Sequence, residues 1–243
     1  MRKILLFVLS FFTLNAEQIY ANFDVVALKS SKLVFQSSGV LEWIGVDVSS
    51  VVKKGDELAR LDSKDEQIML QNAQAELLKA TSASDFSTLT FEKFKQVKDL
   101  TSAQSYDEAK FNYHKAQAEL KKAKIAVDNA KYALEKKSLK APYDGIISAK
   151  SSEVGNGVFA LNSEIFQIIS YPEVKISILI DEKYINSVKI GDEFKFKIAD
   201  SGEKSVKISL IYPTIDQKTR KFKAEAITQG VKIGSFGEGY IVK

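Results

Sequence analysis

The order of apolar and polar residues divides the chain into three blocks. Residues 21–62 alternate apolar and polar side chains between scattered glycines, which is the period-two pattern of β-strands. Residues 63–138 contain neither glycine nor proline and are rich in Ala, Lys, Glu and Gln, which predicts helix. Residues 139–243 hold all three prolines and strand-like runs such as VKISILI and EFKFKIA. The pattern predicts a mostly β chain with one helical insertion.

The helical block repeats its apolar residues every seven positions, which is the spacing of a coiled-coil seam. In the second half of the block, the seam consists of Tyr106, Tyr113, Leu120, Val127 and Leu134, with Ala109, Ala116, Ala123 and Ala130 three residues later. In the first half, a weaker seam consists of Leu70, Leu77, Ser84 and Phe91, with Ala73, Ala80, Ser87 and Phe94 three residues later. The small alanines predict two helices that approach closely.

The helical block is expected to reverse direction within residues 99–105, because Asp, Thr and Ser favour helix N-caps over helix interiors. Each helix then has about 35 residues and a length of about 50 Å. Outside the seam, we interpret each helical turn as Lys, Glu, Gln and Asp. One narrow apolar stripe is therefore expected on each helix. A helical bundle domain needs a wider stripe. The pattern therefore favours a projecting hairpin over a bundle.

Two similar β-segments flank the helical block, at residues 38–62 and 144–169. Each begins with a glycine and an apolar pair, at Gly39 in the first and at Gly145 in the second. Each ends with a turn followed by apolar residues three apart. The turns contain Gly55 and Asn162, residue types that tolerate a positive φ. We interpret the segments as two β-halves that pack face to face, with the hairpin inserted in the loop between them.

The first sixteen residues have the pattern of a secretory signal peptide. Two basic residues precede an apolar run from Ile4 to Leu14, and Asn15 and Ala16 follow it. The run is short for a membrane span, which needs about 20 residues. An uncleaved anchor is the alternative, but cleavage near Glu17 and export to the periplasm are expected.

The composition excludes several classes of function. The chain has no cysteine, so disulfides, thiolate metal sites, thiol nucleophiles and lipid attachment to a cysteine are excluded. Hydrophobic content of 45% and charged content of 27% are typical of a soluble globular protein. The net charge is +4, and without the basic residues of the signal it falls to 33 cations against 31 anions. This balance gives no sign of a nucleic-acid partner.

No catalytic, metal or cofactor site emerges from the sequence, and the chain is not expected to be an enzyme. His114 is the only histidine and falls on an exposed helix flank, while Met1 and Met69 are the only methionines. A zinc site would therefore have to rely on carboxylates. The GNG at 155–157 lacks the Lys-Ser/Thr of a phosphate loop, and the adjacent carboxylates Asp181 and Glu182 are interpreted as surface groups.

Three motifs in order carry a resemblance to a known family. They are VVKKGDELARLD at 51–62, the heptad hairpin, and SLKAPYDGII at 138–147, which is close to the pattern T-x-I-x-A-P-x-D-G. With Gly191-Asp192, the YP at 212–213 and IDQKTRKFKAEA at 215–226, the chain resembles periplasmic adaptor subunits, or membrane fusion proteins, of RND-type tripartite efflux pumps. The resemblance implies an α+β fold: a split lipoyl-like β-module carrying a coiled-coil hairpin, plus an antiparallel β-barrel.

This resemblance implies a division of the chain into segments. They are a signal peptide at 1–16, N-terminal strands joining the barrel at 17–37, lipoyl-like halves at 38–62 and 139–170, the hairpin at 63–138 and the barrel at 171–243. The family's membrane-proximal domain is expected to be absent or vestigial.

The family implies an adaptor located in the periplasm and peripheral to the inner membrane. It would bridge an inner-membrane transporter and an outer-membrane channel as a homo-oligomeric ring, and drugs or small molecules would be exported. An adaptor of an ABC-type exporter or a type I secretion system is the alternative. A lipoyl or biotinyl carrier is disfavoured, because the hairpin replaces the turn that would present the modified lysine. A general coiled-coil scaffold is the remaining possibility.

The resemblance also implies which residues act. The family's hairpin tip carries Arg, Leu and Ser followed by Tyr-Asp; here the Arg and Leu registers hold Phe91 and Lys95, and Lys93 with Val97 are possible substitutes. The expected channel-docking residues are Lys93, Leu100, Thr101, Ser102, Gln104, Tyr106 and Asp107. The expected structural residues of the lipoyl-like module are Gly39, Gly55, Asp56, Pro142, Asp144 and Gly145.

Overall fold

The computed structural model describes residues 18–198 and 202–242. The expected signal peptide at 1–16 and its cleavage site at Glu17 lie outside the described residues. The chain forms two compact units. One contains residues 31–168, and the other combines the N-terminal strand with the segment that begins at residue 169.

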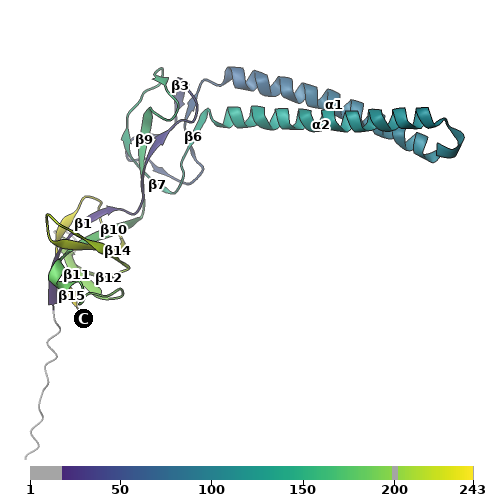
Figure 1. The fold of residues 1–243 in the computed structure, drawn as a ribbon. Coiled ribbons are helices and arrows are strands. Elements are labelled where there is room, and N and C mark those ends of the chain that lie inside the picture. The colour runs from purple at the N-terminus through teal and green to yellow at the C-terminus, as the bar shows by residue number, and fades with distance from the viewer. Residues whose placement is uncertain (1–17, 199–201, 243) are drawn as a thin grey trace, which may run out of the picture. The chain divides into compact units, whose positions relative to one another are not determined.

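The unit of residues 31–168 contains eight described strands in two four-stranded sheets (Figure 1). Before the hairpin come β2 (Ser30–Val34), β3 (Gly39–Ile44), β4 (Val51–Val52) and β5 (Glu57–Leu61). After it come β6 (Ser138–Lys140), β7 (Gly145–Lys150), β8 (Gly157–Val158) and β9 (Glu164–Ser170). Residues 31–34, which the sequence grouped with the barrel, lie in a sheet of this unit.

The two β-halves are interlocked. The strand order in one sheet is β2-β9-β7-β4, and in the other it is β6-β5-β3-β8. Each sheet thus takes two strands from the first half and two from the second. The expectation that each half packs as a separate face against the other was wrong, because cross-pairing gives the short strands backbone partners from both halves.

The core of this unit lies between the two sheets. The apolar residues three apart at the end of each half, Leu58 with Leu61 and Ile165 with Ile168, have no exposed surface. In the second turn the positive φ falls on Leu161, at 59°, and not on Asn162 as the sequence suggested. The turn is held instead by backbone hydrogen bonds, such as the one from Leu161 N to Phe35 O.

The other unit is a curled antiparallel sheet of seven described strands, ordered β12-β11-β15-β1-β10-β14-β13. The strands are β1 (Gln18–Ala27), β10 (Glu173–Asp181), β11 (Glu193–Ile198), β12 (Gly202–Lys207), β13 (Leu210–Asp216), β14 (Lys221–Gln229) and β15 (Phe236–Val242), with the short 3₁₀ helix η2 (Glu182–Tyr184). Lys204 on β12 donates a hydrogen bond to Gly230 O beyond the end of β14, which brings strands far apart in the sheet order together.

The core of this sheet contains aromatic rings in edge contact. Along β1 every second side chain is buried, which matches the predicted alternation. Phe23 packs at 4.9 Å from Phe196 and at 5.8 Å from Phe194, measured between ring centroids. A side chain at Gly239 would lie 2.5 Å from Lys195 O, so only glycine allows β15 to approach β11 so closely.

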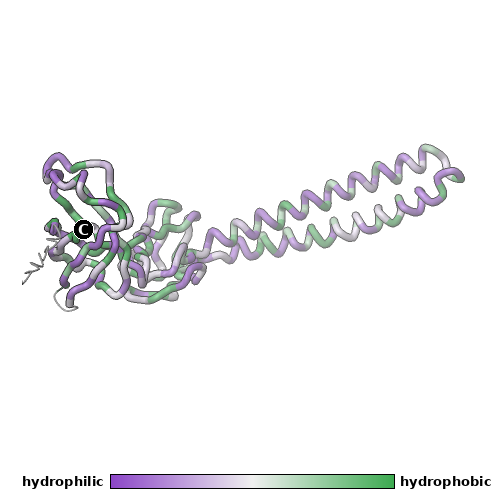
Figure 2. Tube along the Cα trace, turned by 90° about the horizontal axis from the view of Figure 1, so that it is seen from below, coloured by the Kyte–Doolittle hydropathy of each residue, from purple (hydrophilic) through white to green (hydrophobic). Residues whose placement is uncertain are grey.

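The inserted hairpin consists of α1 (Lys64–Gln96) and α2 (Ala103–Glu135), joined by the 3₁₀ helix η1 (Lys98–Leu100). Each α-helix has 33 residues and is therefore about 50 Å long. Both helices run side by side along their length, and apolar positions recur along both (Figures 1 and 2). Among the described residues, no helix combines the length and apolar character that a membrane crossing requires.

Candidate docking surfaces of the hairpin

The seam between α1 and α2 is narrow and built from small side chains. The heptad residues of both helices are buried or half-buried: Ala109 is 7% exposed and Val127 4% exposed. Ser84 is the buried polar residue of α1, and its Oγ accepts a hydrogen bond of 3.0 Å from Gln117 Nε2. Gln117 also reaches Thr88 Oγ1 at 3.4 Å. This polar bridge fixes which residues of the two helices lie level.

The middle of α1 carries serines and threonines, which are poor helix formers. Thr81, Ser82, Thr88 and Thr90 each donate a side-chain hydrogen bond to the carbonyl four residues earlier. These bonds satisfy the hydroxyls without breaking the helix. The helical conformation of this segment therefore depends on α2 packing against it more than on intrinsic propensity.

An aromatic cluster locks the seam below the tip. The ring of Phe91 lies 5.7 Å from that of Tyr106 and stacks on that of Tyr113 at 5.2 Å. The ammonium of Lys98 lies 5.2 Å from the Tyr106 ring centroid, within cation–π range. Phe91, in the register where the family carries Arg, thus faces the partner helix. Tyr106 is likewise half-buried in the seam.

The chain reverses between Val97 and Ser102, which overlaps the predicted region of residues 99–105. Ser102 is the N-cap of α2, and its Oγ accepts a hydrogen bond of 3.2 Å from Ser105 N. Leu100 is 89% exposed and Val97 44% exposed. Thr101 is half-buried, whereas Gln104 is exposed. The reversal therefore presents a large apolar side chain to solvent on a turn whose following helix is well capped.

Two of the expected docking residues lie in the helices on either side of the reversal and not in the reversal itself. Lys93 is exposed in the last turn of α1, below the reversal. Asp107 lies beyond the first turn of α2, which contains no acidic residue. Asp107 is therefore too far from the N-terminus of α2 to stabilise it through the helix dipole, because that effect fades within one turn.

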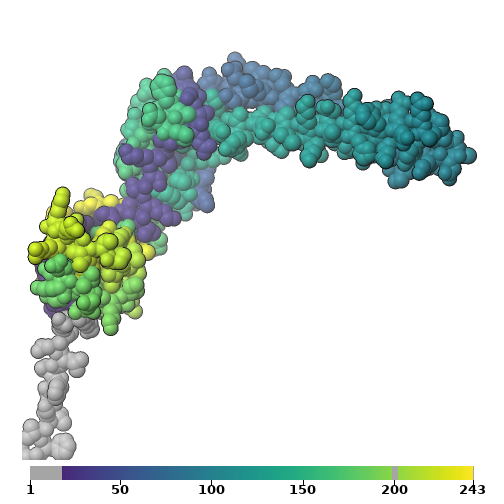
Figure 3. All heavy atoms as spheres, in the orientation of Figure 1, coloured from purple at the N-terminus to yellow at the C-terminus, as the bar shows by residue number. Residues whose placement is uncertain are grey.

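Large apolar side chains on the outside of the hairpin were missed by the sequence reasoning. Phe86 is 72% exposed, Leu89 64% and Phe111 66%. On the face that Figure 3 shows, the sheets of the same unit do not cover the hairpin beyond its base. The expectation of a single apolar stripe per helix was wrong. The sequence contained a signal of a second stripe on the second helix: Phe111, Ala118, Ile125 and Tyr132 are spaced seven residues apart.

The base of the hairpin is tied to the β-sheets by polar contacts. Lys137 Nζ lies 3.1 Å from Glu66 Oε1 and donates a hydrogen bond of 3.1 Å to Ser38 O. Ser37 Oγ donates to Lys136 O at 3.0 Å. The Lys137–Glu66 pair is mostly shielded, with side chains 14% and 19% exposed. These contacts hold both helix ends against the module and so set the direction in which the hairpin leaves it.

Two cavities of about 440 and 460 Å³ flank β6 beside this base. The first is lined by Lys32, Phe35 and Pro142 among others, and the second by Arg60 and Lys131. Lys140 lines both. Lys32 is already paired with Glu164 at 2.8 Å.

Residues of the KKGD turn and of the APYDG segment join the two β-halves. Asp144 Oδ1 accepts a hydrogen bond of 2.7 Å from Lys54 N, which lies in the turn of the other half. Gly55 has a φ of 93° and donates to Ala141 O at 2.8 Å. Asp56 Oδ2 closes the same turn by accepting from Lys53 N at 2.8 Å. The APYDG segment thus locks onto the KKGD turn.

The two expected glycines of the strands play different parts. Gly145 is buried and pairs with Val52. Gly39 opens β3 opposite Val158, and a side chain there would meet Leu61 at an ordinary 3.4 Å. Its position does not demand glycine on steric grounds.

The curled sheet holds one nearly buried carboxylate on β14. Glu225 is 7% exposed; its Oε1 lies 2.9 Å from Lys175 Nζ and accepts a hydrogen bond of 2.7 Å from the hydroxyl of Tyr212. Lys223 Nζ is 3.3 Å away. Burial raises the pKa of Glu225, but the hydrogen bonds from Tyr212, Lys175 and Lys223 outweigh burial and hold its pKa below the ordinary value.

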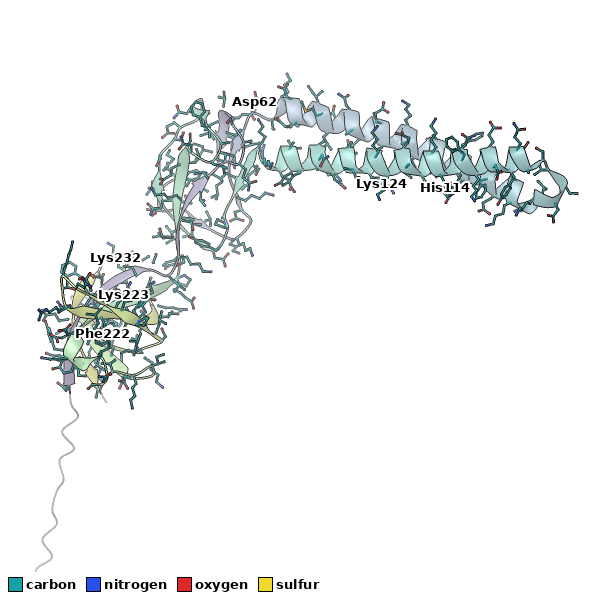
Figure 4. The ribbon with its side chains drawn as sticks, viewed as in Figure 1. Asp62, His114, Lys124, Phe222, Lys223 and Lys232 are labelled. Carbon is teal, nitrogen blue, oxygen red and sulfur yellow. The ribbon has the colours of Figure 1, made fainter. Side chains whose placement is uncertain are left out.

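The residues considered for chemistry come from different parts of the chain. His114 is exposed on the shaft of α2, as Figure 4 shows, whereas Asp181 Oδ1 accepts from Lys183 N in the other unit. Gly155 lies in a turn before β8 with a φ of 92°. Within 18–198 and 202–242, no three His, Cys, Asp or Glu residues are placed to hold a metal ion. The expectation of no enzyme, metal or cofactor stays a prediction.

A known protein family has a hairpin that matches the hairpin of this chain. Residues 69–136 match the family model described as the alpha-helical hairpin domain of RND membrane fusion proteins. Among curated proteins, the cobalt-zinc-cadmium resistance protein CzcB of Cupriavidus metallidurans is 27% identical over 204 residues, covering 81% of this chain and 38% of the relative. The nickel and cobalt resistance protein CnrB of the same organism is 26% identical over 211 residues, covering 84% and 52%. The chain thus spans about two fifths to half the length of these relatives.

Solved structures share the fold. A MacA–MexA chimera containing the Pseudomonas aeruginosa MexA hairpin superposes with a TM-score of 0.72 at 22% identity, over 93% of this chain and 81% of the other. The membrane fusion protein Spr0693 of Streptococcus pneumoniae R6 gives a TM-score of 0.71 at 17% identity, over 93% and 98%. These likenesses establish the fold. They agree with the resemblance stated from the sequence: residues 69–136 match the hairpin of RND membrane fusion proteins, and the chain shares its fold with these solved structures.

Proposed function

We propose that the chain is a periplasmic adaptor that bridges an inner-membrane efflux transporter of the RND type and an outer-membrane channel. The observation that carries this proposal is the hairpin. It matches the RND adaptor hairpin model and ends in an exposed tip about 50 Å from the β-module. Its relatives are named as resistance and cation efflux proteins. The alternative of an ABC-type or type I partner lacks such support.

The geometry supports a mechanical role. The shielded ion pair Lys137–Glu66 and the backbone contacts at the base fix the hairpin on a rigid pair of interlocked sheets. Because the base of the hairpin is fixed on these sheets, its tip is held at a defined place. At that end Leu100 offers apolar surface, and Ser102 caps the helix behind it. We propose that the tip meets the channel and that Thr101 and Gln104 form the polar rim of this contact.

The remaining parts of the proposal concern location and assembly. Residues 1–16 would direct export, and the mature chain would lie in the periplasm, peripheral to the inner membrane. Several copies would form a ring, with the lipoyl-like modules as a collar and the curled sheets toward the transporter. The chain would act on its cargo without catalysis and without a cofactor.

The proposal is tested by export in living cells. A strain lacking the gene is complemented with the wild type, Ser102→Arg, Leu100→Asp or the shaft control Asn72→Arg, and susceptibility to drugs and to cobalt, zinc and cadmium salts is measured. Both tip variants should fail to restore resistance at wild-type protein level, because an unpaired charge would be buried in the contact. Full resistance with both tip variants would remove the tip from the mechanism.

A further inference from the structure

The strand β6, at the base of the hairpin, forms an open edge of its sheet, since its one described neighbour there is β5. Lys137 O accepts a hydrogen bond of 2.9 Å from β5, and Ala141 N donates one of 2.9 Å to the residue before β5. Backbone groups alternate in direction along a strand. The N–H and C=O groups of Ser138 and Lys140 therefore point away from β5, toward the open edge.

This edge faces a cavity that a further strand could enter. The cavity of about 440 Å³ is lined by Ser138–Lys140 of β6 and by Lys32–Val34 of β2, which is the edge strand of the other sheet. The apolar side chains of Leu33 and Leu139, each 7% exposed, line it from the two strands. A strand added beside β6 would therefore lie between the two sheet edges, next to apolar side chains.

The second cavity, of about 460 Å³, has an excess of positive charge. Four cations line it, of which Arg60 and Lys137 already form ion pairs. The other two, Lys131 and Lys140, are exposed and form no ion pair with another described residue. Among the described residues of this lining, Glu135 is the one carboxylate that no cation pairs. Two cations and one anion are thus available to a ligand.

We propose that the edge of β6 binds an extended segment of another protein in which apolar and acidic residues alternate. Successive side chains of an added strand point to opposite faces. One set would lie in the first cavity beside Leu33 and Leu139, and the other beside Lys131 and Lys140. Backbone hydrogen bonds supply affinity in this mode of binding, and the cavities select the side chains.

The charge of this edge also argues against a second copy of this chain as the occupant. Pairing β6 with another β6 would bring the side chain of Lys140 close to that of its copy, and like charges across a strand pair are destabilising. An acidic segment meets no such repulsion. The inference goes beyond the adaptor role and does not depend on it.

A synthetic peptide tests the proposal. A fluorescently labelled peptide of alternating valine and glutamate, with three glutamates, is titrated with the full-length chain, and fluorescence anisotropy measures its binding. One control peptide has lysine in place of glutamate, and the other has the same composition with its glutamates in one block. The alternating acidic peptide should bind at least about tenfold more tightly than either control. Equal affinity for the block peptide would leave only charge attraction and would overturn the proposal.

Amide exchange measured by NMR locates the bound peptide on the chain. In the saturated complex, the outward amides of Ser138 and Lys140 should exchange at least about tenfold more slowly, because they become hydrogen-bonded to the peptide. The amide of Leu139, which faces β5, should be unchanged. Binding without slower exchange at Ser138 and Lys140 would place the peptide elsewhere and refute the assignment of this edge.

Three variants of the full-length chain test the charge selection. Lys140→Glu should weaken binding of the acidic peptide at least about tenfold, and Glu135→Gln should tighten it several-fold. The control Lys124→Glu makes the same change in net charge at an exposed position on the shaft of α2 and should leave the affinity unchanged. Equal weakening by both Lys→Glu variants would show attraction to the whole chain in place of a site at β6.

Discussion

The hairpin and the β-sheets distribute large apolar side chains in opposite ways. Six phenylalanines are almost fully buried in the two sheet units: Phe23, Phe35, Phe166, Phe194, Phe196 and Phe222. In the hairpin, the buried residues are Ser84, Ala109 and Val127, whereas Phe86 and Phe111 are mostly exposed. The sheets thus bury most of their phenylalanines in their own cores, although Phe159 and Phe236 are exposed. The hairpin leaves much of its apolar surface available to partners.

The largest loss of stability is expected in the sheet core. Phe23→Ala removes a ring that contacts both Phe194 and Phe196 and should destabilise its unit by about 3–5 kcal/mol. Urea unfolding followed by near-ultraviolet circular dichroism measures the change. The hairpin control Phe111→Ala removes the same ring from an exposed position and should cost well under about 1 kcal/mol. Equal losses would break the comparison between the two regions.

The stability of the seam should be sensitive to larger side chains and not to smaller ones. Ala116→Leu places a large side chain where the helices approach closely and should cost about 1–3 kcal/mol. Lys122→Leu adds a similar side chain on the exposed flank and should cost well under about 1 kcal/mol. Thermal unfolding at the helical band of the circular dichroism spectrum distinguishes them. A seam with room for leucine would show the same melting temperature for both.

The buried carboxylate of Glu225 should make the stability of the curled-sheet unit depend on pH. The pKa of Glu225 is lower in the folded chain than in the unfolded chain. Its contribution is therefore present above the unfolded pKa, near 4.3, and is lost as pH falls through the folded pKa. Glu225→Gln should cost about 1 kcal/mol at pH 7, because Lys175 and Lys223 still reach water. In denaturant titrations at falling pH, the wild-type advantage should shrink below pH 4; a constant difference would contradict this assignment.

The smallest effect is expected at the tip. Ser102→Ala removes the N-cap bond to Ser105 N and should cost about 0.5–1 kcal/mol locally. Amide exchange of residues 103–105 should accelerate accordingly. Asp107→Asn, placed beyond the first turn, should leave these amides unchanged. Acceleration in Asp107→Asn alone would reverse the roles assigned to the two residues.

Much of the fold followed from periodicity. The seven-residue series identified the seam because small and large residues alternate there in a way that only close helix packing explains. The interlocking of β2–β5 with β6–β9 could not be predicted, since a period-two pattern shows which face is buried but not which strand lies beside it. Leu161 adopts a positive φ because backbone hydrogen bonds impose it, against its own preference.

Less of the candidate docking site than of the fold could be predicted from the sequence. Ser102 and Leu100 were placed correctly at the reversal because capping chemistry is local. Lys93 and Asp107 lie in the helices beside the reversal, which the sequence could not show because the predicted end of a helix is uncertain by a few residues. Their docking role stays a prediction. Glu225 was overlooked, since a glutamate on a strand is typical of a solvated face and only the arrangement of Lys175 and Tyr212 shows otherwise.

The interlocked sheets have a consequence for how the chain folds. Neither sheet can be completed from the first half alone. The strand β2 has only β9 as a neighbour, and β5, although it pairs with β3, has its second neighbour in β6; both β9 and β6 are made later. Zipping of a helical hairpin is local and fast, whereas closing a long loop is entropically costly. Once α1 and α2 have paired, Ser63 and Lys137 are already close together, and the long loop between β5 and β6 has in effect been closed. We therefore expect the two helices to pair before the sheets form. A variant that weakens the seam should then slow the formation of both sheets.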